Sequence, residues 1–103
     1  MENSISNLVT SLQRVIEFFS IIPNWKDWTD ILIKIKLGII DGDTREEALK
    51  LLSTYFGGMG TLNDLVFCEG NRNIPDGYTE HEANKEFEVL LHKLYKDFKC
   101  CYK

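Results

Sequence analysis

The sequence predicts an all-α protein, folded as a compact single-domain bundle of four to five helices over residues 1–103. Apolar residues recur at intervals of three and four through most of the chain, which is the period of an amphipathic helix. Capping and breaking residues divide these stretches into separate helices. The apolar fraction of 44% and charged fraction of 27% are ordinary for a globular domain, and a chain of this length buries roughly 60–70% of its unfolded surface.

The first helix is expected over residues 4–22, and Pro23 ends it because proline disfavours a helical residue before it. Its polar side lacks the lysines of a membrane-surface helix, so we expect its apolar side to face a protein core. The apolar positions are Ile5, Leu8, Val9, Leu12, Val15, Ile16, Phe19 and Ile22.

The second helix is expected to begin with Asn24 as its N-cap, to carry Asp27 near its positive end, and to reach about Ile39. Residues 31–37 also alternate partly like a strand. No matching hairpin partner lies nearby, so the helix is preferred.

The third helix is expected after a turn formed by Gly38 and the run 41–43. Thr44, with Glu47 three residues later, has the pattern of a capping box. Gly57 then stands where a helix-terminating glycine is expected. The apolar side of this helix carries Ala48, Leu49, Leu52, Tyr55 and Phe56.

The last helix is expected to begin at a second capping box, Thr79 with Glu82, and to run to about Cys101. A loop over residues 69–79 precedes it, and its Pro-Asp-Gly run at 75–77 is a turn signature. Between the third helix and this loop, Thr61 with Asp64 is a weaker capping signal.

A glycine-rich corner is predicted between the third and fourth helical segments. It comprises Gly57, Gly58, Met59, Gly60, Thr61, Asn63 and Asp64. Consecutive backbone N–H groups before a helix start could bind an anion. However, the lysine of a phosphate-binding loop is missing and no strand precedes the corner. We therefore interpret the motif as a structural corner, with a small-molecule or anion site as the alternative.

Negative charge is concentrated in the middle of the chain. The net charge is −4, which argues against a general nucleic-acid binder. Residues 41–90 carry eleven acids against four bases, a net −7, whereas residues 91–103 carry a net +3. The acids predict a surface for a basic protein partner. The predicted partner-binding residues are Asp41, Asp43, Glu46, Glu47, Glu69, Asp76, Glu80 and Glu82.

No pattern of residues indicates catalysis, a cofactor or a metal. Counted from Asp41, the sixth and twelfth positions of a calcium loop hold Glu46 and Leu52 rather than glycine and glutamate. His81 and His92 are eleven residues apart, about 16 Å along a helix, so they cannot share an ion. We expect a protein that is not an enzyme.

The three cysteines, Cys68, Cys100 and Cys101, show no disulfide or zinc spacing, and reduced thiols in a cytoplasmic protein are expected. The first 23 residues lack the basic start and continuous apolar run of a signal peptide. No stretch reaches the roughly 20 apolar residues that span a bilayer, so no membrane association is expected.

Residues 57–66, Gly-Gly-Met-Gly-Thr-Leu-Asn-Asp-Leu-Val, resemble a segment shared by a group of small bacterial proteins of unknown function. That segment reads GGMGS-hydrophobic-ND-hydrophobic, and Thr61 stands here where serine is usual. The resemblance is clear over about residues 49–68. Several short acidic proteins of this kind resemble immunity or antitoxin partners of polymorphic toxins, including Rhs-type effectors.

The resemblance implies a cytoplasmic immunity protein that binds a cognate toxin domain and neutralises it by occlusion. Two other classes of function stay open on the sequence alone. One is the anion or small-molecule binder at the glycine corner. The other is a homo-oligomer that associates through the tryptophan-bearing helix near residues 25–39.

Overall fold

The computed structural model describes residues 2–56 and 61–102. In this part of the chain it contains four α-helices and two short 3-10 helices, with no strand, so the predicted all-α bundle is confirmed. The helices are α1 (Glu2–Ser20), α2 (Lys26–Ile40), α3 (Arg45–Ser53) and α4 (Glu80–Cys101), with η1 (Leu62–Asp64) and η2 (Glu69–Asn71) between α3 and α4.

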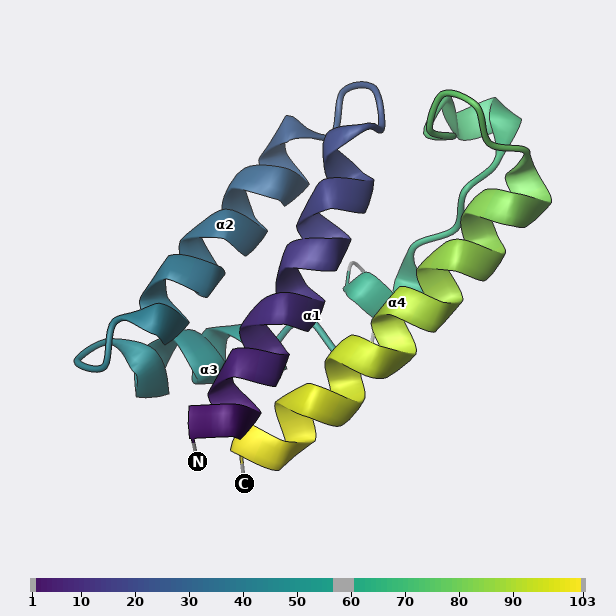
Figure 1. Ribbon diagram of the computed structural model, residues 1–103. Coiled ribbons are helices and arrows are strands. Elements are labelled where there is room, and N and C mark those ends of the chain that lie inside the picture. Colours follow the sequence, from purple (N-terminus) through teal and green to yellow (C-terminus); the bar gives the residue numbers. More distant parts are fainter. Residues whose placement is uncertain (1, 57–60, 103) are drawn as a thin grey trace.

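Helix α1 lies at the centre of the bundle, between α2 and α4 (Figure 1). Helix α3 packs against α2, and Phe56, just beyond α3, meets Phe98 of α4 at 5.1 Å between ring centroids. Because two helices flank α1, its apolar positions are almost completely buried; Leu8, Leu12, Val15 and Phe19 have no exposed surface. The molecule is elongated, with principal extents of 41 × 24 × 22 Å.

The start of α2 differs from the prediction. Asn24 is not the N-cap, because its φ of 65° places it in the left-handed region, whereas an N-cap residue is typically extended. Trp25 occupies the N-cap position instead. Its ring packs edge-on against Phe19 at 5.0 Å and lies tilted against Phe67 at 5.3 Å, so aromatic packing places this residue at the helix entrance.

The α2–α3 connection corrects two further expectations. Gly38 does not break α2 but lies within it, and a Cβ atom at this position would stand 2.8 Å from the Cβ atom of Ala48 in α3. The predicted capping box of Thr44 and Glu47 does not form. The Thr44 hydroxyl instead donates to the Gly38 carbonyl at 2.8 Å, and Arg45 Nε donates to the Ile39 carbonyl at 2.7 Å. The close approach of the two helices therefore directs these side chains to the unsatisfied carbonyls at the end of α2.

The capping box at the start of α4 is confirmed. The Thr79 hydroxyl accepts a hydrogen bond from the Glu82 amide at 3.1 Å, and the Glu82 carboxylate accepts one from the Thr79 amide at 2.9 Å. These bonds with Thr79 lower the pKa of Glu82.

A buried polar cluster joins α1 to α4. The Ser11 hydroxyl donates a hydrogen bond to Asp97, and Lys93 Nζ lies 3.0 Å from the same carboxylate. Asp97 is only 6% exposed, and burial raises its pKa. The hydrogen bonds from Ser11 and Lys93, with the charges of Lys93 and Lys96, outweigh burial, so the pKa of Asp97 lies below its ordinary value.

We expect Gly38→Ala to lower the free energy of unfolding by about 1–2 kcal/mol, measured by urea denaturation. The clash with Ala48 should outweigh the gain of about 1 kcal/mol that alanine brings to a helix interior. Gly42→Ala is the control, since a Cβ there meets no atom within 4 Å. A stabilised Gly38→Ala protein would contradict the close packing of α2 on α3.

Asp97 should make the free energy of unfolding depend on pH in the acidic range. Because folding lowers its pKa, its contribution is present above about pH 4, the ordinary value in the unfolded chain, and is lost as pH falls through the folded-state pKa. Urea denaturation at several pH values should show a flatter dependence for Asp97→Asn than for the wild type. Asp30→Asn is the control, since Asp30 makes an exposed ion pair with Lys26. If the free energy of unfolding depended on pH identically in Asp97→Asn and the wild type, this role of Asp97 would be contradicted.

Candidate functional site

The segment between η1 and η2 is extended, and its backbone is bonded by the side chains of two asparagines, Asn84 of α4 and Asn73 of the following loop. Asn84 of α4 accepts a hydrogen bond from the Phe67 amide at 2.8 Å and donates one to the Phe67 carbonyl at 2.7 Å. Asn73 accepts from the Cys68 amide at 3.0 Å and donates to the Val66 carbonyl at 2.9 Å. The two amides thus take the place of a neighbouring strand and satisfy backbone groups that would otherwise be buried without partners.

This attachment carries Phe67 into an aromatic core. Phe67 has no exposed surface, and its ring meets Phe87 at 5.3 Å and Phe18 at 5.6 Å, both edge-on. Phe18 in turn meets Tyr78 edge-on at 5.6 Å. Phe18 therefore contacts both Phe67 and Tyr78.

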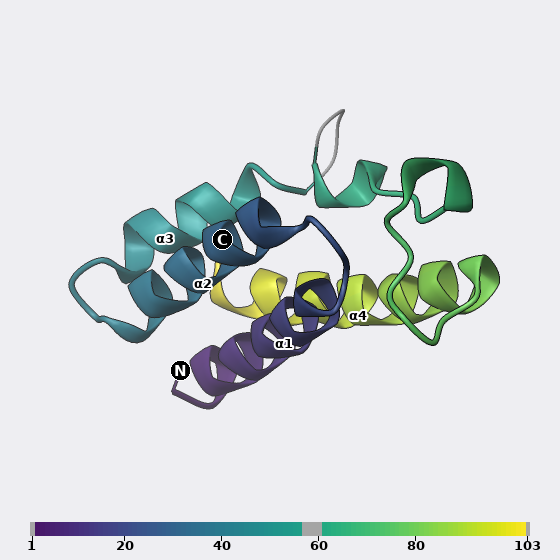
Figure 2. The ribbon, with the colours of Figure 1, turned by 90° about the horizontal axis from the view of Figure 1, so that it is seen from above.

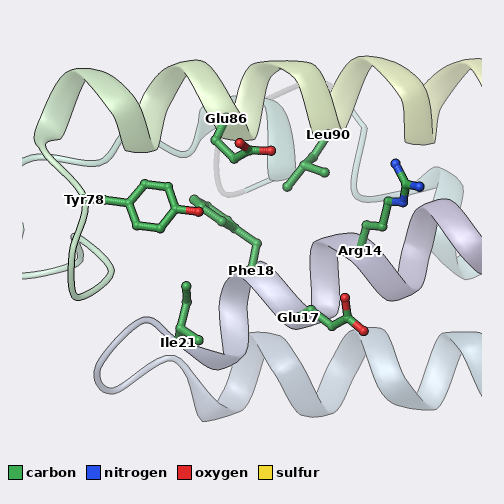
Figure 3. Close-up of a pocket in the computed structure, with 7 residues that line it drawn as sticks. All are labelled: Arg14, Glu17, Phe18, Ile21, Tyr78, Glu86 and Leu90. Carbon is green, nitrogen blue, oxygen red and sulfur yellow. The ribbon is translucent and has the colours of Figure 1, made fainter.

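Tyr78 stands at one end of a groove between α1 and α4, which we call the Tyr78 groove (Figure 3). Its volume is about 340 Å³. Figure 3 shows Glu86 and Leu90 extending from α4, with Arg14 and Glu17 on the facing helix α1. The lining residues are Arg14, Glu17, Phe18, Ile21, Tyr78, Glu86 and Leu90.

A second hollow of about 470 Å³ adjoins the Tyr78 groove, because Tyr78 and Glu86 line both. It continues along the outer side of α4 past His81, Glu82, Lys85 and Val89. Ile21 in the groove is 47% exposed and Val89 in the adjoining hollow is 61% exposed. The region therefore combines accessible apolar surface with charged groups of both signs, which is typical of a protein-binding surface.

The predicted acidic residues do not form one continuous face. Asp41, Asp43, Glu46 and Glu47 lie in the α2–α3 turn and the first turn of α3, at one end of the molecule. Glu69, Asp76, Glu80 and Glu82 lie in the 69–79 loop and the first turn of α4, at the opposite end (Figures 1 and 2). A single partner of ordinary size would therefore engage one group or the other.

Three of these acids also have local structural roles. Glu80 accepts a hydrogen bond from the Glu69 amide at 3.3 Å, Glu82 closes the capping box, and Asp41 accepts from the Asp43 amide at 3.0 Å. Their carboxylates partly serve to hold the loop and the turn. Only the Glu69–Glu82 group lies beside the Tyr78 groove.

The centre of the glycine corner, Gly57, Gly58, Met59 and Gly60, lies outside the described residues. The chain on either side returns to the bundle, because the Leu62 amide donates to the Tyr55 carbonyl at 2.8 Å and Leu62 is fully buried. Thr61 precedes η1, and Asn63 and Asp64 are part of it. The Leu62–Tyr55 hydrogen bond therefore joins the start of η1 to the residues that follow α3.

Sequence reasoning missed the Tyr78 groove. The sequence pattern places Arg14 on the polar side of the first helix and Tyr78 in a loop, and nothing local joins the two. The adjacent residues Ile21 and Ile22 carried a usable signal, because two consecutive side chains at a helix end cannot both face the core. One of the two isoleucines therefore had to lie at the surface. In the structure Ile22 is buried and Ile21 faces the groove.

The described residues also bear on metal binding, membrane spanning and the tryptophan-bearing helix. Among them, no three His, Cys, Asp or Glu side chains come together as a metal site requires. None of the helices in this part of the chain is long and apolar enough to cross a bilayer. Trp25 and Trp28 of the expected oligomerisation helix pack inward on Phe19, at 5.0 and 6.1 Å.

The fold is a small all-α domain with a groove between α1 and α4 that apolar and charged side chains line. The chain belongs to a family described as a domain of unknown function, DUF6966, whose model matches residues 23–75. The match covers α2, α3 and the asparagine-held segment, whereas the residues that line the Tyr78 groove lie on either side of it. No curated protein and no solved structure matches the chain.

Proposed function

We propose that this protein is an immunity protein, which binds a bacterial toxin domain in the cytoplasm and neutralises it by occlusion. The observation that carries the proposal is the Tyr78 groove with the acidic loop beside it. Tyrosine and arginine are the residues that most often dominate binding energy at protein interfaces, and Tyr78 and Arg14 both line the groove. The resemblance of residues 57–66 to small acidic immunity-like proteins supports the same class of function.

The charge around the groove favours a basic partner. Residues 69–88 carry six acids, Glu69, Asp76, Glu80, Glu82, Glu86 and Glu88, against the two bases Arg72 and Lys85. Negative potential at this end of the molecule would attract and orient a positively charged surface. Ile21, Phe18 and Leu90 would then give apolar contact at the centre of the interface.

Occlusion requires a large contact area and no catalytic step, so the proposal assigns this protein no enzymatic activity. A standard interface covers about 800 Å² on each partner, and the accessible surface here is 6695 Å². One end of the molecule can supply that area. The opposite acidic group at the α2–α3 turn would then stay outside the interface.

The proposal predicts that a neighbouring gene encodes the toxin, and the first test is association with the product of that gene. We expect the two proteins to co-purify, and co-expression to protect the host from the toxin. Absence of both association and protection would refute the proposal.

The second step locates the surface with two matched double reversals. Glu17→Lys with Asp76→Lys changes charges beside Tyr78, and Asp43→Lys with Glu46→Lys makes the same change in net charge at the opposite end. We expect the first pair to slow association about tenfold at low salt and the second pair to have little effect. Added salt should shrink the difference, because exposed charges are screened. Loss of binding in the second pair alone would move the interface to the α2–α3 turn.

A further inference from the structure

We draw no further inference here: the strongest candidate, the exposed apolar patch of Leu37, Ile40 and Leu51 beside the hollow between α2 and α3, is bordered by charges of both signs at Lys34 and Glu47, and nothing in the structure shows what covers it.

Discussion

The pair of hydrogen bonds between the Asn84 side chain and the Phe67 backbone is the interaction on which the placement of the α3–α4 connection depends. An extended segment inside an all-α fold has no neighbouring strand, so its amide and carbonyl groups need other partners. Asn84 supplies one of each, at 2.8 and 2.7 Å, and Asn73 does the same for the flanking Cys68 and Val66. The connection from α3 to α4 is thereby joined to α4, and it ends beside the Tyr78 groove.

The contacts can be followed from the Phe67 backbone to the surface at Tyr78. With its backbone held, Phe67 fills the core against Phe87 and Phe18, and Phe18 supports the ring of Tyr78. Tyr78 then forms one end of the groove between α1 and α4. A series of contacts thus joins the Asn84 side chain, through Phe67 and Phe18, to Tyr78.

The helices could be predicted because their apolar period and the Thr79–Glu82 capping box are properties of neighbouring residues. The errors lie where contacts between residues far apart in the sequence determine the local conformation. Asn24 has good capping chemistry but takes a left-handed conformation, because Trp25 packs on Phe19 and Phe67. Thr44 bonds Gly38 rather than Glu47, because α3 approaches α2 closely at Ala48.

The candidate site was less predictable than the helices. Composition indicated acidic surface, but only the tertiary structure separates Asp41–Glu47 from Glu69–Glu82 at opposite ends of a molecule 41 Å long. Asn84 is seventeen residues from Phe67, and no local pattern marks it as the partner of that backbone.

Amide hydrogen exchange at Phe67 tests the central claim most directly. In the wild type this amide should exchange slowly, since the Phe67 ring is fully buried and the hydrogen bond to Asn84 is partly buried. In Asn84→Ala, exchange at residues 66–68 should accelerate about 10- to 100-fold, the equivalent of the roughly 1–3 kcal/mol lost when a buried group loses its hydrogen bond, while α1 and α2 keep their protection. Lys85→Ala, at the neighbouring exposed position, should change nothing. An unchanged rate at Phe67, or an equal acceleration throughout the protein, would contradict the account.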